Sequence, residues 1–196
     1  MPKKLILTSE GLNTSSGQKL IAEALSKDEL GSKKIFLFHK PYDSIKEVLA
    51  AACLNMGFQE ENIYFPDSDV TCDRIAEMDY IYVTEGNTFE ILAAMKQSGF
   101  FKAMRKAVSN GAVYIGASAG AMIAGQDIAL AAEFDENHVQ LQDLEALKLF
   151  QGTVIPHYTE SELGRYIKNM KESKPEVIAR YPKIYAVANG RKLIIH

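Results

Sequence analysis

The sequence contains no tryptophan, two cysteines and no long apolar run within its 196 residues. Cys53 and Cys72 form no metal-ligand spacing, so we expect reduced thiols in a cytoplasmic protein and no metal centre. No stretch approaches the roughly 20 apolar residues that a membrane-spanning helix requires. These absences lead us to expect no cofactor and no membrane partner.

The chain also has little excess charge of either sign. It carries 22 Lys and Arg against 25 Asp and Glu, which gives a formal net charge of −3. The basic residues are scattered rather than grouped, so we expect no nucleic acid as a main partner. Residues 1–8 have no long apolar core and no cleavage site, so we interpret them as leading into a first strand rather than as a signal peptide.

Length and hydrophobic content predict one domain over residues 1–196. Hydrophobic residues make up 47% of the chain, an ordinary share for a globular protein with a sizeable core. No linker, internal repeat or low-complexity stretch divides the sequence. The composition is compatible with a monomer and with a small homo-oligomer.

Short apolar segments alternate with segments of helical periodicity along the whole chain. This alternation predicts an α/β fold in which a mainly parallel sheet has helices on both faces. Asn189-Gly190 predicts a C-terminal antiparallel hairpin, and Ser44-Ile-Lys-Glu47 is typical of the start of a helix. The expected strands cover residues 4–8, 35–39, 62–65, 79–84, 113–115, 152–156, 184–188 and 193–195.

The most informative stretch is Gly116-Ala-Ser118-Ala-Gly120, which follows the expected strand 113–115. A serine at a tight strand-to-helix turn is the pattern of a nucleophile elbow, because small neighbours allow a strained turn that exposes the hydroxyl. Ser118 is therefore the candidate nucleophile. The same pentapeptide also arises by chance, and such a junction can be purely architectural, so its meaning depends on its context.

A serine nucleophile needs a base, which is usually a histidine. The chain has four histidines: His39, His138, His157 and His196. His157 follows Pro156 at the end of an expected strand, where a rigid element supports it at the rim that holds Ser118. We expect His157 to be the base, and a structural or surface histidine is the alternative.

The remaining catalytic groups are an acid and an oxyanion site. Glu133 and Asp135 lie between serine and histidine in the sequence and are the candidates to orient the imidazole, although for either residue alone a solvated acidic loop is the slightly favoured interpretation. The N–H groups of Ala119 and Gly86 are the candidate oxyanion donors. Asn87 also fits the N-cap of the helix that follows.

Three motifs together resemble the serine peptidases of the dipeptidase E and cyanophycinase group: Gly86-Asn-Thr-Phe89, Gly116-Ala-Ser118-Ala-Gly120-Ala121 and Pro156-His157-Tyr-Thr159. The resemblance implies a three-layer fold like that of class I glutamine amidotransferases and an intracellular hydrolase that acts on short peptides without a cofactor. Ser118 would be the nucleophile and His157 the base, with Gly86 and Ala119 forming the oxyanion hole. For the acid we favour Glu133, with Asp135 second.

The sequence departs from this group at several points. Glu85 stands where the group usually has a glycine, and its charge would oppose an oxyanion unless it points away. Asn87 and Arg165 are the candidate substrate-binding residues, and Arg165 resembles the cyanophycinase branch, although it could equally be a surface charge. The alternatives to a peptidase are a catalytically silent module that binds a small ligand and an esterase.

Overall fold

The computed structural model describes residues 4–25, 29–39, 45–66 and 70–196. At its centre lies a six-stranded sheet with the strand order β3-β2-β4-β5-β1-β8. All neighbouring strands are parallel except β8, which is antiparallel to β1. The mainly parallel α/β sheet that the sequence predicts is therefore confirmed. Its strands are β1 (Leu5–Thr8), β2 (Ile35–Phe38), β3 (Ile63–Tyr64), β4 (Tyr80–Val83), β5 (Val113–Ala117) and β8 (Lys192–Ile195).

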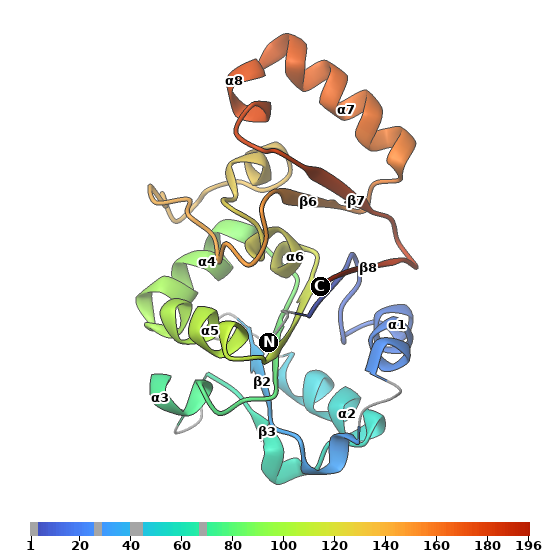
Figure 1. Cartoon of the computed structure of the whole chain (residues 1–196), viewed down its shortest axis with the longest axis vertical. Helices are drawn as coiled ribbons and strands as arrows, with labels where there is room; N and C mark the ends of the chain where they lie inside the picture. Colours follow the sequence, from blue (N-terminus) through green and yellow to red (C-terminus); the bar gives the residue numbers. More distant parts are fainter. Residues whose placement is uncertain (1–3, 26–28, 40–44, 67–69) are drawn as a thin grey trace.

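Alternate side chains of the central strands enter two separate apolar cores. In β4, Ile81 and Val83 belong to one core, whereas Tyr80 and Tyr82 belong to the other. This two-residue period follows from strand geometry and leaves both sheet faces to be covered. Helices lie on either side of the sheet in Figure 1. The first core includes residues of α4 (Thr88–Gln97), α5 (Phe100–Ser109) and α6 (Ala119–Ile123), and the second includes residues of α1 (Ser15–Leu25) and α2 (Lys46–Met56).

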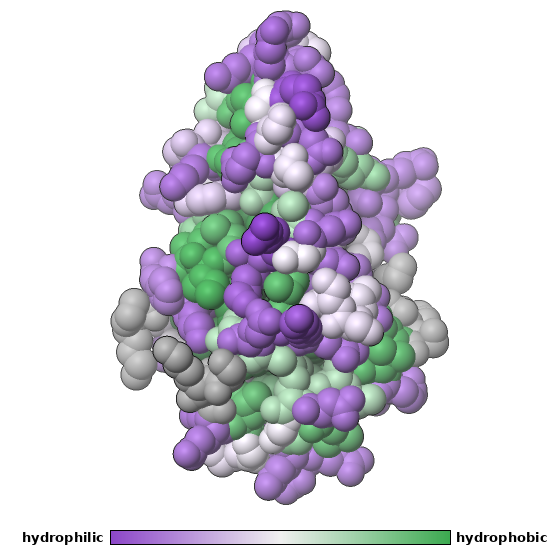
Figure 2. Space-filling view, turned by 90° about the vertical axis from the view of Figure 1, so that its right-hand side faces the viewer, coloured by the Kyte–Doolittle hydropathy of each residue, from purple (hydrophilic) through white to green (hydrophobic). Residues whose placement is uncertain are grey.

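A second, smaller sheet pairs β6 (Thr153–Pro156) with β7 (Ile184–Val187) in parallel. It lies at the end of the molecule that carries α7 (Glu160–Ser173) and α8 (Pro175–Ile178) (Figure 1). Thr159 and Glu162 form a complete capping box at the start of α7. Polar residues cover most of this end of the molecule in Figure 2.

The C-terminal strands differ in one respect from the predicted hairpin. The antiparallel strand is present, but β8 pairs with β1 while β7 pairs with β6. A turn does form, because the N–H of Arg191 donates to the carbonyl oxygen of Ala188 (3.1 Å) and Gly190 has a φ of 70°. The strands separate after this turn because each completes a different sheet.

The remaining short elements are α3 (Cys72–Ile75) and the 3-10 helices η1 (Leu30–Ser32), η2 (Glu60–Asn62) and η3 (Ala129–Glu133). Ser44, the predicted cap of α2, lies outside the described residues. Within the described ranges, no helix has the length and apolar character needed to cross a bilayer. Both Cys53 and Cys72 are free thiols.

Candidate active site

Ser118 occupies the corner between β5 and α6. Its backbone has a φ of 47° and a ψ of −106°, a conformation that residues other than glycine rarely adopt. The N–H of Ser118 donates to the carbonyl oxygen of Thr8 (2.8 Å), and its carbonyl oxygen accepts from the N–H of Ala121 (2.9 Å). The strained corner is thus held to β1 on one side and to α6 on the other.

The glycines flanking Ser118 allow α6 to approach the sheet closely. A Cβ at Gly120 would lie 2.2 Å from the carbonyl oxygen of Val83, and one at Gly116 would lie 2.6 Å from that of Gly120. The buried hydroxyl of Tyr114 donates to the carbonyl oxygen of Gly120 (2.8 Å). The small residues of the motif are therefore required by close backbone contact as well as by the turn.

The Ser118 hydroxyl contacts the imidazole of His157 across the two sheets. The distance from Oγ of Ser118 to Nε2 of His157 is 3.0 Å. His157 follows β6 directly and has a φ of 65°, so both partners stand on unusual backbone conformations at strand ends. Of the other histidines, His39 is buried and His138 lies beside a surface glutamate. The two residues chosen from the sequence as nucleophile and base are therefore brought together.

The second nitrogen of the imidazole contacts a residue that we did not predict for this role. Nδ1 of His157 lies 2.7 Å from Oδ1 of Asn189, in the turn between β7 and β8. An amide oxygen only accepts hydrogen bonds, so this contact favours the tautomer with the proton on Nδ1. Nε2 is then free to accept the Ser118 proton. The Asn189-Gly190 pair signals a turn in the sequence but gives no sign of this contact.

Neither acid predicted from the sequence occupies this position. The carboxylate of Glu133 pairs with Nζ of Lys174 (2.6 Å). The carboxylate of Asp135 accepts hydrogen bonds from the N–H (2.9 Å) and the hydroxyl (2.5 Å) of Thr88. In the described part of the chain, neither contacts the His157 ring. The geometry therefore corrects the expectation that Glu133 or Asp135 orients the imidazole, because both carboxylates satisfy other groups.

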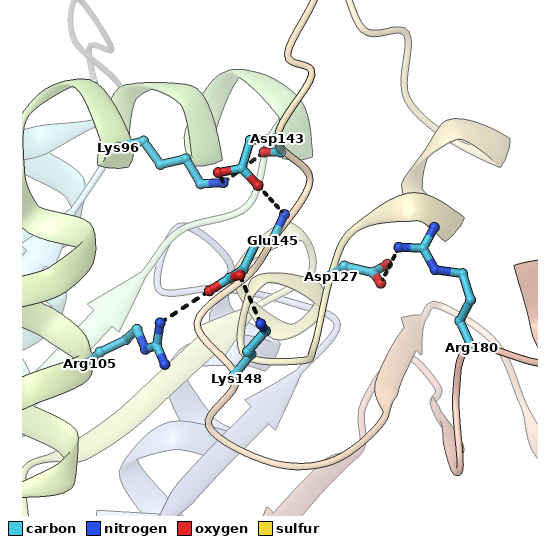
Figure 3. A network of polar contacts seen from close by, with 7 residues as sticks. All are labelled: Lys96, Arg105, Asp127, Asp143, Glu145, Lys148 and Arg180. Atoms are coloured by element: carbon cyan, nitrogen blue, oxygen red, sulfur yellow. Dashed lines mark hydrogen bonds and ion pairs between the residues drawn. The ribbon is translucent and has the colours of Figure 1, made fainter.

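Ion pairs fix the long segment between α6 and β6, to which both of these acids belong. Lys96 of α4 pairs with Asp143 (2.8 Å), and Arg105 of α5 pairs with Glu145 (3.2 Å). Such contacts hold the acidic segment against the helices that cover the main sheet. Figure 3 draws the charged residues of this network, which are Lys96, Arg105, Asp127, Asp143, Glu145, Lys148 and Arg180.

The loop after β1 holds His157 and the turn that carries Asn189 in place. The buried hydroxyl of Ser9 accepts the N–H of His157 (2.9 Å) and donates to the carbonyl oxygen of Val187 in β7. A carboxylate oxygen of Glu10 accepts the N–H of Gly190 (2.7 Å). This polar loop at the end of a strand is visible in the sequence, but the roles of Ser9 and Glu10 depend on contacts with distant segments.

Two backbone N–H groups stand at the rim that bears Ser118. Gly86 follows β4 with a φ of 135°, and Ala119 is the first residue of α6. β4 and β5 are neighbours, with Val83 opposite Gly116, so their ends lie at one edge of the sheet. Among the residues that the structure describes, neither N–H donates to an acceptor. Both remain available to an oxyanion, as the prediction requires.

Asn87 caps α4. Its Oδ1 accepts the N–H groups of Phe89 and Glu90 (3.1 Å each), and its Nδ2 donates to the carbonyl oxygen of Glu136 (2.8 Å). The predicted capping role is therefore confirmed. These contacts occupy the side-chain oxygen of Asn87, so the geometry gives a structural role to a residue expected to bind substrate.

Arg165 lies exposed on α7 and donates to the hydroxyl of Ser161 (3.1 Å). It borders an open hollow whose lining includes Tyr158, the residue that follows His157. Burial raises the pKa of Tyr166, and the charge of Glu133 raises it further, so this phenol stays protonated. The hollow is lined by Tyr158, Glu162, Arg165, Tyr166 and Asn169.

The described residues include no group of three or more side chains suited to a metal ion. The groups that the structure brings together at the site are a serine hydroxyl, an imidazole, an amide oxygen and two backbone N–H groups. This set of groups is suited to acyl transfer, in which a proton moves between serine and imidazole while charge develops on a carbonyl oxygen.

Comparison with known proteins identifies relatives that cover this site. The model of peptidase family S51 matches residues 54–196, which include Ser118, His157 and Asn189. An uncharacterized peptidase of Listeria monocytogenes, Lmo0363, is 32% identical over 127 residues, 62% of this chain and 58% of that protein. Peptidase E of Nostoc sp. PCC 7120 is 27% identical over 195 residues, 95% of this chain and 79% of that protein.

The fold has a matching crystal structure. A Listeria monocytogenes EGD-e protein, provisionally assigned as peptidase E, superposes with a TM-score of 0.72 and 26% identity over 100% of this chain and 95% of that one. The first curated relatives are matched over 58%, 49% and 43% of their own lengths, so the chain spans about half of them.

Proposed function

Because the chain belongs to peptidase family S51, we propose that it is a serine peptidase that hydrolyses short peptides through an acyl-enzyme on Ser118. The proposal assigns Ser118 as nucleophile, His157 as base and Asn189 as the group that orients the imidazole. The N–H groups of Gly86 and Ala119 form the oxyanion hole. The proposed setting is the cytoplasm, where the two cysteines remain thiols.

In the acylation step, Oγ of Ser118 attacks the carbonyl carbon of the scissile bond while Nε2 of His157 takes the hydroxyl proton. The carbonyl oxygen becomes an oxyanion that accepts the N–H groups of Gly86 and Ala119. The imidazolium then gives its proton to the leaving amine as the carbon–nitrogen bond breaks. A water molecule, deprotonated by His157, attacks the ester and restores Ser118.

The observation that carries this proposal is the 3.0 Å contact between Oγ of Ser118 and Nε2 of His157. The distance is within the range in which a base can accept the hydroxyl proton. The contact joins residues 39 positions apart on two sheets, and each stands on a rarely adopted backbone conformation. Strained residues that meet in this way are typical of a functional site.

Asn189 changes what the third group contributes. In a Ser-His-Asp triad, the carboxylate both orients the imidazole and stabilises its charged form. A neutral amide supplies the orientation but not the opposite charge, as in peptidases with a Cys-His-Asn arrangement. We therefore expect an active enzyme in which replacing Asn189 lowers the rate less than replacing the aspartate of a Ser-His-Asp triad does.

A serine-directed fluorophosphonate tests the proposal. We expect Ser118→Ala to abolish labelling and peptide turnover, and His157→Ala to slow both by about 10²- to 10⁴-fold, the usual contribution of a general base. Ser173→Ala and His138→Ala, which change exposed residues of the same types elsewhere, serve as controls and should leave both unchanged. Persistent labelling or turnover in Ser118→Ala would contradict the assignment.

The same experiment addresses the alternatives. A silent binding module would show no dependence of labelling on His157, and an esterase would hydrolyse simple esters but not peptides. The substrates should be a panel of dipeptides and isoaspartyl dipeptides with acidic, basic and neutral first residues. Turnover of peptides that is lost in Ser118→Ala would support the peptidase over both alternatives.

A further inference from the structure

The Asn189-Gly190 turn, which carries the amide that contacts His157, joins two strands of different sheets. β7 reaches the turn from the smaller sheet, where it pairs with β6, and β8 leaves it for the main sheet, where it pairs with β1. In an ordinary hairpin, the two strands pair with each other and so fix the turn between them. Both residues of this turn are exposed. The position of the Asn189 amide therefore depends on other contacts of the turn.

A carboxylate from the end of β1 makes such a contact. Oε2 of Glu10 accepts the N–H of Gly190 at 2.7 Å. An ionised acceptor forms a stronger hydrogen bond with a backbone N–H than a neutral acceptor does. Gly190 follows Asn189, and the Cα of Asn189 lies in the peptide plane that this bond holds. The bond therefore fixes the point from which the Asn189 side chain extends toward His157.

Glu10 is itself held by its neighbours. The same Oε2 accepts the hydroxyl of Ser16 in α1 (3.0 Å), and the carbonyl oxygen of Glu10 accepts the hydroxyl of Thr8 (2.9 Å). Gly17 of α1 is buried against this loop, and a Cβ there would lie 2.5 Å from the carbonyl oxygen of Glu10. The carboxylate is thus an acceptor on a well-packed segment rather than a solvated surface charge.

Glu10 completes a row of three consecutive residues that each hold one group of the site. The carbonyl oxygen of Thr8 accepts the N–H of Ser118 (2.8 Å), and the hydroxyl of Ser9 accepts the N–H of His157 (2.9 Å). The carboxylate of Glu10 holds the turn that bears the amide. The end of β1 is therefore a common support for all three groups.

We propose that Glu10 is a positioning residue whose carboxylate fixes the turn and thereby keeps Oδ1 of Asn189 on Nδ1 of His157. This inference rests on the proposed function and adds an acidic residue to it. The influence of Glu10 passes through the backbone of the turn and the Asn189 side chain. If the turn shifts, the proton on Nδ1 loses its acceptor, the ring changes tautomer or orientation, and Nε2 accepts the Ser118 proton less readily.

A double-mutant cycle of Glu10→Ala and Asn189→Ala tests this route, with kcat and KM measured for one dipeptide. We expect Glu10→Ala to lower kcat by about tenfold with little change in KM, since a displaced imidazole affects the chemical step more than binding. In the Asn189→Ala background the same change should lower kcat by less than about twofold, because no amide is left to position.

Two further variants separate the charge from the contact. Glu10→Gln keeps a neutral acceptor at nearly the same volume and should lower kcat by only about threefold. Glu172→Gln, at an exposed carboxylate of α7, makes the same charge change elsewhere and should leave both constants unchanged. Thermal unfolding of each variant shows whether it is folded. If Glu10→Ala does not fold, Glu10→Gln takes its place in the cycle.

A second readout does not depend on activity. Long-range ¹H–¹⁵N NMR of the His157 ring reports which nitrogen carries the proton when the imidazole is neutral. The wild type and Glu172→Gln should show mainly the Nδ1–H tautomer. Asn189→Ala should show less of it, and Glu10→Ala should change in the same direction.

Two results would overturn the inference. One is a loss of kcat on replacing Glu10 that is absent in the wild-type background or equally large with and without Asn189. The other is an unchanged tautomer in both Glu10 variants. If the wild type hydrolyses no peptide, the proposed function fails, and the tautomer measurements alone decide whether Glu10 holds the amide on the ring.

Discussion

Replacing Asn189 tests how the imidazole of His157, the proposed base, is oriented. We expect Asn189→Ala to lower kcat by about 10- to 100-fold, or roughly 1.4 to 3 kcal/mol, since it removes one well-formed hydrogen bond to Nδ1 of His157. The distance of 2.7 Å between Oδ1 of Asn189 and Nδ1 of His157 indicates a close hydrogen bond, so its removal should lower kcat clearly. Both side chains are exposed, however, so water can replace part of the contact, and the loss should be smaller than for a buried triad aspartate.

For Asn189→Asp, which keeps nearly the same side-chain volume, we expect the opposite effect on activity. It places a carboxylate beside the ring, and the attraction between unit charges about 4 Å apart in a water-like surrounding is about 1 kcal/mol. We expect kcat/KM to rise by about fivefold, since this attraction stabilises the imidazolium formed in the transition state. The acid limb of its pH profile should move to higher pH for the same reason.

The assay is a steady-state pH profile of dipeptide hydrolysis for both variants and the wild type. Asn110→Ala, at the exposed C-cap of α5, is the matched control. Thermal unfolding of each variant separates loss of activity from loss of structure. If Asn189→Ala keeps kcat within about twofold of the wild type, and Asn189→Asp leaves the profile in place, the proposed role of this amide is refuted.

Three further predictions concern positioning, packing and thiol chemistry. Ser9→Ala should lower kcat by about tenfold with little change in KM, because it removes the hydrogen bond that the N–H of His157 donates to the Ser9 hydroxyl. A parallel change in both constants would argue against a positioning role. Gly120→Ala should lower the melting temperature by several degrees, since its Cβ would lie 2.2 Å from a β4 carbonyl, whereas Gly164→Ala, with open space around its Cβ, should not. Burial raises the pKa of Cys53 to about 12, whereas Cys72 is exposed. A thiol reagent at pH 8 should therefore modify Cys72 alone in the native protein and both cysteines in denaturant. Rapid modification of both cysteines in the native protein would contradict this packing.

The sheet could be predicted because its signals are local. Each central strand is a short apolar run whose alternate residues face two cores, and that pattern needs no knowledge of distant segments. The Ser118 corner is local in the same sense, since a strand, a turn and small residues follow one another. His157 could be selected because a strand ends directly before it and parallel strand ends share a rim.

The orienting group could not be predicted in this way. Asn189 reaches His157 because β7 and β8 separate into different sheets after a turn, whereas the Asn-Gly pair itself signals a simple hairpin. Glu133 pairs with Lys174, 41 residues away, and no local pattern of residues distinguishes that partner from His157. The choice among nearby acids depends on long-range packing, which periodicity and spacing do not encode.

The exposed Asn189-Gly190 turn also makes the site susceptible to slow deamidation. Asparagine followed by glycine is prone to lose ammonia through a succinimide, since glycine offers little steric hindrance to attack by its nitrogen on the amide carbon. Hydrolysis of that ring leaves either an aspartate, with a carboxylate beside His157, or an isoaspartate, whose backbone is longer and whose carboxylate is displaced. Aged preparations should therefore become mixtures of faster and slower enzyme, and peptide mapping of this turn would account for their drift in activity.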